Sequence, residues 1–169
     1  WNVYDYDGEL ININNKYIDD NINRVDSYNS KLSVLFSLKS SSKEVNEITV
    51  IILKKYLSLG ANPNIPAISS CGKLLSPLYI CCCNCHNKYG LEMCEILLQN
   101  GAHAEPEYTS LTVATPLISV LLQNHTDTAI DFVKLLLKYG ANKNAIIDNK
   151  SVLQYADKNY KGPNKKEII

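Results

Sequence analysis

The chain has 169 residues, of which 46% are apolar, and its seventeen basic residues balance seventeen acidic ones. This apolar content is enough to bury a core, and the scattered basic residues argue against nucleic acid or an anionic membrane as a partner. No apolar run approaches the roughly 20 residues that span a bilayer, and no secretion signal is visible, so we expect a cytoplasmic protein without membrane contact.

Residues 1–29 lack the pattern that organises the rest of the chain. The stretch ELININN, residues 9–15, alternates well enough for a short strand, and the spacing of Tyr17, Ile18 and Ile22 is helical. We expect this segment to be an N-terminal cap that covers the apolar end of the domain that follows. A partner-binding arm is the alternative, and the three aromatic residues in its first six positions favour it.

A helix ending recurs three times along the chain. The phrases LKKYLSLGANPN, CEILLQNGAHAE and VKLLLKYGANKN each run from apolar residues into Gly-Ala, at Gly60, Gly101 and Gly140. Glycine adopts at little cost the left-handed conformation that closes many helices. The three glycines lie 41 and 39 residues apart, so the phrases predict the ends of three equivalent helices.

A helix start recurs in step with these endings. The phrases are SPLYICC from Ser76, TPLISVL from Thr115 and the weaker SVLQYAD from Ser151. A hydroxyl at the N-cap followed by proline is favourable, because proline lacks an N–H that the first turn would leave unpaired. Ser76 precedes Gly101 by 25 residues, and Thr115 precedes Gly140 by the same distance. The predicted unit is a helix, a short loop, a second helix and a protruding loop.

These phrases resemble the ankyrin repeat, whose pattern combines TPLHLAA with EIVKLLLxxGADVN. Residues 115–144 carry the resemblance most fully, although the units are longer than the family's usual ~33 residues. The resemblance implies an all-α fold, an ankyrin-repeat solenoid of about four irregular repeats with an N-terminal capping segment. The expected repeats span about 30–64, 65–105, 106–144 and 145–169, the first degenerate and the last truncated.

Long, irregular repeats with LLLKYGAN phrases, in a chain rich in Asn, Ile and Lys, are similar to the ankyrin proteins of poxviruses. This resemblance implies a monomeric viral adaptor for host range or immune evasion that captures a host defence or signalling protein. Many such proteins recruit a cullin ubiquitin ligase through a Skp adaptor and a C-terminal F-box-like segment. These 169 residues hold no such segment, so that role would depend on further sequence. A cellular ankyrin scaffold is the alternative.

Four of the six cysteines and a histidine fall in the six positions that begin at Cys81. Aligned with TPLHLAA, Cys81 and Cys82 take positions that the family fills with small buried residues, and Cys94 takes one usually filled by valine. Cysteine is small and often buried, whereas adjacent helical residues point about 100° apart and cannot all face one ion. We expect core thiols and no cofactor. A metal-binding domain built on Cys82, Cys85 and His86 is the alternative of a different class.

Catalytic motifs are missing from the sequence. It contains no GxxxxGK[ST] phosphate loop, no GxGxxG and no GxSxG. The histidines His86, His103 and His125 fall in or beside expected loops, where solvated side chains are the usual case. Acidic pairs such as Glu105 with Glu107 are expected to be solvated too. We expect a protein that is not an enzyme.

The resemblance also implies which residues contact a partner, before each TPL phrase and after the buried small pair of each first helix. These twelve positions, called the partner face below, are Lys73, Leu75, Cys83, Asn84, Tyr108, Leu111, Thr112, Leu122, Gln123, Asp148, Lys150 and Lys158. We expect Tyr108, Leu111 and Leu122 to be the binding hot spot, because apolar and aromatic anchors carry most interface energy. The alternative is that the long loop folds back and buries them.

Overall fold

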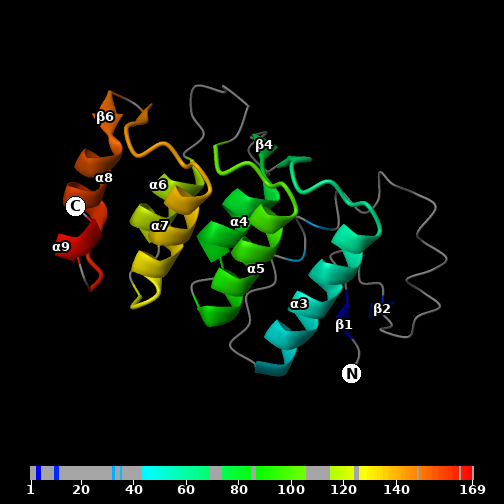
Figure 1. Ribbon diagram of the computed structural model, residues 1–169. Coiled ribbons are helices and arrows are strands. Elements are labelled where there is room, and N and C mark those ends of the chain that lie inside the picture. Colours follow the sequence, from blue (N-terminus) through cyan, green and yellow to red (C-terminus); the bar gives the residue numbers. More distant parts are fainter. Residues whose placement is uncertain are drawn as a thin grey trace.

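Helices dominate the part of the chain that the structure describes (Figure 1). The computed structural model describes residues 3–4, 10–11, 32, 35, 43–68, 74–84, 87–105, 115–123, 126–147, 149–163 and 165–168. The helices are α3 (Lys43–Ser58), α4 (Pro77–Asn84), α5 (Lys88–Gln99), α6 (Pro116–Gln123), α7 (Ala129–Lys138), α8 (Val152–Asn159) and α9 (Lys165–Ile168). Within these ranges no helix is both long and apolar enough to cross a membrane.

Short antiparallel strand pairs accompany the helices. They are β1 (Val3–Tyr4) with β2 (Leu10–Ile11), β3 (Ala67–Ile68) with β4 (Leu74–Leu75), and β5 (Ile146–Ile147) with β6 (Lys150–Ser151). The β2 strand lies in the ELININN stretch, so the strand predicted there is confirmed. Apart from β1 and β2, the predicted N-terminal cap of residues 1–29 falls outside the described residues. The β3–β4 and β5–β6 hairpins lead into α4 and α8, where they form the protruding loops of their units.

The predicted helix starts are confirmed, and each uses the expected hydroxyl. Ser76 Oγ accepts the backbone N–H of Tyr79 at 3.1 Å, and Thr115 Oγ1 accepts that of Ile118 at 3.3 Å. In α8, which does not begin with proline, Ser151 and the glutamine three residues later bond reciprocally in a capping box. Each cap therefore satisfies N–H groups that the first turn of a helix leaves without partners.

The predicted helix ends are confirmed as well. Gly60, Gly101 and Gly140 follow α3, α5 and α7 with φ angles of 89°, 87° and 90°, in the left-handed region that other residues rarely adopt. The alanine after each glycine donates its N–H to the carbonyl five residues earlier, at 3.1, 2.9 and 3.0 Å. This bond is the one that defines a Schellman ending, which satisfies a carbonyl of the last turn.

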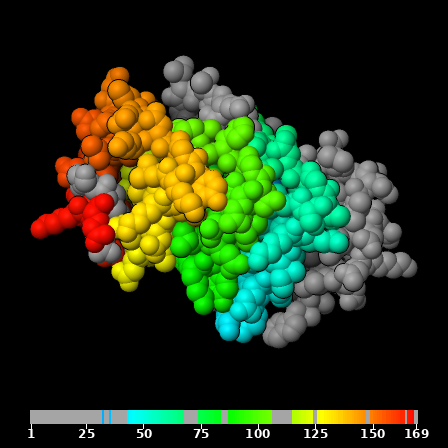
Figure 2. All heavy atoms as spheres, in the orientation of Figure 1, coloured from blue at the N-terminus to red at the C-terminus, as the bar shows by residue number. Residues whose placement is uncertain are grey.

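Successive helices pack in two layers (Figure 1). The first helices, α4, α6 and α8, pack side by side, and the second helices, α3, α5 and α7, form the other layer. Within a unit, α4 packs on α5, α6 on α7 and α8 on α9. Figure 2 shows the same order as consecutive bands of colour across the molecule. The described chain is thus a row of helix pairs in which each pair contacts its neighbours in sequence.

The apolar core lies between the two layers and continues from one unit to the next. Leu78 of α4 and Leu117 of α6 stand at equivalent positions and are 0% and 1% exposed. Their equivalent in α8, Leu153, is 52% exposed, because no described helix packs on the far side of α8. Leu32 and Leu35, both helical, join the core at the N-terminal end.

The turns after the second helices are tied to one another by side chains. The Asn64 amide donates to the carbonyl of Gly101 at 2.8 Å and accepts the N–H of His103 at 2.8 Å. One unit later, Glu105 Oε1 accepts the N–H of Asn142 at 2.8 Å. His103 has an exposed side chain, as expected. The expectation of a solvated Glu105 was wrong, because this side chain is half-buried in the tie to the next turn.

Candidate partner-binding surface

Seven of the twelve partner-face positions lie within the described residues, and they come from β4, α4, α6, β6 and α8. These elements are the hairpins and the first helices. Asn84 is the last residue of α4. The positions outside the described residues are Lys73, Tyr108, Leu111, Thr112 and Asp148. They include two of the three expected hot-spot residues.

The structure brings Cys83 and Gln123 together across the boundary between two units. Both lie at the C-terminal ends of first helices, Cys83 on α4 and Gln123 on α6. The Gln123 side-chain amide donates to Cys83 Sγ at 3.7 Å, which is within the range of the longer hydrogen bonds that sulfur accepts. Gln123 is exposed and Cys83 is half-buried, so the hydrogen bond orients an exposed amide at the surface.

The two described leucines of the partner face are less accessible than free anchors would be. Leu75 on β4 and Leu122 on α6 are both half-buried, and both pack against the core. Part of each side chain therefore stabilises the fold, and only the remainder is available to a partner. The sequence left two expectations open for Leu122, an exposed hot-spot side chain or a buried one. The observed exposure of this side chain lies between them.

Tyr79 adds a residue that the sequence did not single out. It lies one turn before Cys83 on α4 and is half-buried. Burial raises the pKa of the Tyr79 phenol well above its usual value, and the neighbouring Cys83 thiol raises that pKa further. The phenol is therefore neutral at physiological pH. The spacing of four residues from Cys83 was the available signal, since it puts both side chains on one side of a helix.

The last unit contributes positive charge to the partner face. Lys150 on β6 and Lys158 at the end of α8 are both exposed. The Lys150 ammonium lies 5.7 Å from the centre of the Tyr155 ring, a distance at which a cation and an aromatic face attract one another. Tyr155, also on α8, was not predicted from the sequence. This contact orients the Lys150 side chain over the first helix of its unit.

The cysteines of α4 and α5 are core residues, as predicted. Cys81, Cys82 and Cys94 are each 0% exposed. Cys94 Sγ lies 3.4 Å from Cys81 Sγ and 3.7 Å from Cys82 Sγ, and the Cys81 thiol donates to the carbonyl of Gly90 at 3.7 Å. Burial opposes ionisation of Cys94, but the hydrogen bonds that it shares with the Cys81 and Cys82 thiols lower its pKa to about 6. The three thiols form one cluster inside the first complete helix pair.

The alternative metal site built on Cys82, Cys85 and His86 finds no support in the described residues. Cys82 points into the core, where it contacts Cys94. Cys85 and His86 fall outside the described residues. In the part of the chain that the structure describes, no three His, Cys, Asp or Glu side chains are grouped so that they could hold a metal ion.

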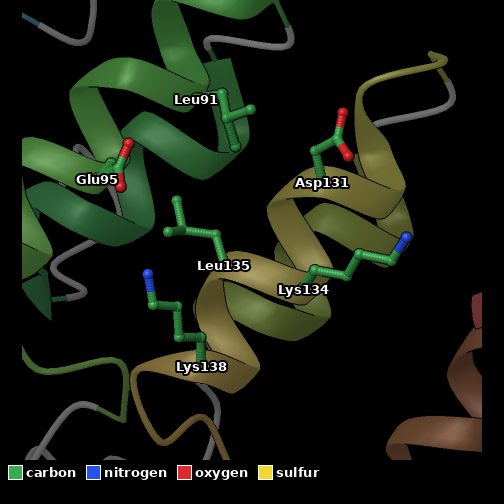
Figure 3. Close-up of a pocket in the computed structure, with 6 residues that line it drawn as sticks. All are labelled: Leu91, Glu95, Asp131, Lys134, Leu135 and Lys138. Carbon is green, nitrogen blue, oxygen red and sulfur yellow. The ribbon is translucent and has the colours of Figure 1, made fainter.

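A shallow groove of about 290 Å³ lies between the second helices α5 and α7 (Figure 3). Leu91 and Leu135 point toward one another across it, and Lys134 extends away from α5 (Figure 3). Glu95, Asp131 and Lys138 complete the lining. All of these residues belong to the second helices, so the groove and the partner face belong to different helix layers.

A scan against protein-family models and a search of curated proteins both give no match to this chain. Three features of the chain bear on its function. They are the repeated helix starts and ends, the packing of the two layers, and the side chains on the first helices.

Proposed function

We propose that the chain is an ankyrin-repeat protein whose function is to bind another protein through the hairpins and first helices. Support comes from the order of the parts. A cap with a hydroxyl, a first helix, a second helix, a left-handed glycine and a hairpin follow one another along the chain, and like helices pack on like helices. The proposed assignment to the ankyrin family comes from the resemblance of the sequence phrases to the ankyrin repeat.

The observation that carries this proposal is the recurrence of one local geometry. Three helices end in glycines whose φ angles agree within a few degrees, at 89°, 87° and 90°, and the following alanines make the same backbone bond. Such endings are common in helices, but three of them at the regular spacings of 41 and 39 residues indicate a repeated unit. A row of such units presents an extended surface that suits a macromolecule.

The proposed partner is a host-cell protein. This part of the proposal comes from the resemblance to poxvirus ankyrin proteins. The proposed function is capture of a defence or signalling protein, and the proposed location is the host cytoplasm. Delivery of that protein to a cullin ubiquitin ligase would need a Skp-binding segment in addition to the residues described here. A cellular scaffold would use the same surface with a partner from its own cell.

Affinity capture from host-cell lysate tests the proposal. The immobilised full chain is compared with the double variant Lys150→Glu, Lys158→Glu, which reverses the two exposed charges of the partner face. Opposed like charges in an interface cost several kcal/mol, so we expect loss of the captured protein by at least about tenfold. Quantitative mass spectrometry of the bound fraction measures this loss.

The matched control is the double variant Lys134→Glu, Lys138→Glu, which makes the same change in net charge on α7. It should retain the partner, and circular dichroism should show both variants folded. Equal retention by both variants would refute the assigned surface. A third variant, Leu111→Asp, tests the expected hot spot. Leu111 is preferred to Leu122 for this test, because the half-buried Leu122 side chain also packs against the core.

A further inference from the structure

The three buried cysteines of α4 and α5 bring their sulfur atoms into contact with one another. Cys94 stands between two partners on the facing helix, 3.4 Å from Cys81 Sγ and 3.7 Å from Cys82 Sγ. No solvent reaches any of the three side chains. Burial accounts for each thiol separately, and the contact of three sulfur atoms adds a chemistry that burial does not need.

We propose that Cys94 and Cys81 form a dithiol site that hydrogen peroxide oxidises reversibly to a disulfide. The two residues lie on α4 and α5, which pack against one another within one unit. Their sulfur atoms must approach from 3.4 Å to the disulfide length of about 2.05 Å. The site is independent of the partner face and of any captured protein.

The oxidation proceeds in two steps. The Cys94 thiolate attacks one peroxide oxygen, the O–O bond breaks, and the sulfur becomes a sulfenic acid while the leaving hydroxide takes a proton to form water. The Cys81 sulfur then attacks the sulfenic sulfur and releases the second oxygen as water. Two thiols and one peroxide thus give one disulfide and two waters, and two electrons pass from sulfur to oxygen. A small thiol such as glutathione reverses the step by exchange.

Cys94 is assigned as the attacking sulfur because it is the centre of the cluster. Its sulfur lies within 3.7 Å of both other sulfur atoms, so either one can resolve a sulfenic acid formed there. Burial opposes ionisation of Cys94, but the hydrogen bonds that it shares with Cys81 and Cys82 lower its pKa. Cys81 is assigned as the resolving sulfur because it is the closer of the two. Cys82 remains a thiol in the oxidised protein.

Access to the site is through local opening of the helix pair. A peroxide molecule cannot touch a sulfur that is 0% exposed, so the rate depends on how often α4 and α5 separate. The oxidation should therefore accelerate several-fold in urea below the unfolding transition. This dependence distinguishes the site from an exposed thiol, whose rate changes little under the same conditions.

The test uses the full chain with Cys71, Cys83 and Cys85 replaced by serine, which leaves the three clustered thiols. After peroxide treatment the protein is unfolded, alkylated, digested with trypsin and measured by mass spectrometry. Lys88 separates Cys81 and Cys82 from Cys94, so a disulfide links two tryptic peptides. We expect the intact mass to fall by two hydrogen atoms, the linked peptides to appear, and a thiol reductant to reverse both changes.

Single changes in this background identify the pair. Cys81→Ala should lower the yield of linked peptides at least about fivefold, whereas Cys82→Ala should leave it unchanged; the opposite pattern would overturn the assignment to Cys81. Three alkylated thiols after peroxide treatment, addition of oxygen without a link, or a link between Cys81 and Cys82 would overturn the site itself. These three outcomes are measured on the protein that keeps Cys81, Cys82 and Cys94. They therefore do not depend on whether a Cys→Ala variant folds.

Discussion

At the scale of single residues, the glycine that closes α7 is a position where the backbone alone sets the residue type. Gly140 has a φ of 90°, and no atom lies within 4 Å of the place that a Cβ would occupy. A substitution there meets no steric obstacle from neighbouring groups. Its whole cost is the strain of placing a side chain on a left-handed backbone.

We expect Gly140→Ala to lower the free energy of unfolding by about 1–2 kcal/mol, because an L-residue resists this conformation. Urea denaturation followed by circular dichroism measures the change. Gly162→Ala is the matched control, because Gly162 is not among the described glycines with positive φ, and it should cost much less. Equal losses at the two positions would contradict the conformational explanation.

Glu105 gives the protein a pH dependence at the same scale. Burial raises the pKa of this carboxyl above its usual value, and the hydrogen bond from the Asn142 N–H only partly offsets that effect. The folded state therefore binds the proton more tightly than the unfolded state does. The protonated Glu105 side chain therefore contributes to the free energy of unfolding at low pH. This contribution is lost as the pH rises from the usual glutamate pKa through the raised pKa of Glu105.

We expect Glu105→Gln to remove this loss, because glutamine keeps an oxygen that accepts the Asn142 N–H and carries no charge. The stability of the variant relative to the parent should increase as pH rises through that window. Thermal unfolding between about pH 4 and 7 measures it, in the range where glutamate titrates. Glu95→Gln, on α5, is the control, and an identical pH response from both variants would contradict the role of Glu105.

Single residues also show where prediction from sequence succeeded and where it stopped. Cys81, Cys82 and Cys94 were predicted to be buried because their place in the unit fixes which way they point. Tyr79 was missed because its environment depends on the thiol one turn later and on packing against the core. The tie from Glu105 to the next turn was missed for a related reason, since it joins residues 37 positions apart.

At the scale of helices and hairpins, prediction was most successful where the chemistry is local. Helix starts at Ser76 and Thr115 and helix ends at the three glycines depend only on a few adjacent residues. The burial of a helix, by contrast, depends on what packs on both of its sides. Equivalent sequence positions in α6 and α8 consequently have very different environments.

Leu117→Ala and Leu153→Ala measure that difference. The two leucines occupy equivalent positions, but Leu117 is 1% exposed and Leu153 is 52% exposed. We expect Leu117→Ala to cost about 2–5 kcal/mol of unfolding free energy, because it leaves a cavity between units, and Leu153→Ala to cost less than about 1 kcal/mol. Urea denaturation measures both, and a large cost at Leu153 would show that another surface covers α8 in solution.

At the scale of the whole molecule, the apolar core is extended along the row of described helix pairs. Each pair gains its stability from its own packing and from the pairs beside it. The first helix α6 contacts both α4 and α8, and the second helix α5 contacts both α3 and α7. The sequence predicted this order because its phrases repeat, although it gave no measure of how tightly neighbouring units pack.

Hydrogen exchange should therefore vary along the row. We expect backbone amides of α5 and α6 to exchange slowest, because each has helices on both sides, and those of α8 to exchange faster, because its described helix contacts are with α6 and α9. Exchange followed by mass spectrometry of peptide fragments gives the order. Uniform protection of all these helices would instead indicate a single cooperative unit.

The ties between turns bear on how such a chain can change over generations. In each tie one side chain, Asn64 or Glu105, bonds main-chain groups of the following turn. The receiving groups belong to the main chain, so a change of side chain at His103 or Asn142 to any residue but proline leaves these groups in place. Lineages can thus vary these two positions without losing the alignment of neighbouring units, whereas inheritance constrains the residue that gives the bond and the left-handed glycine of each turn.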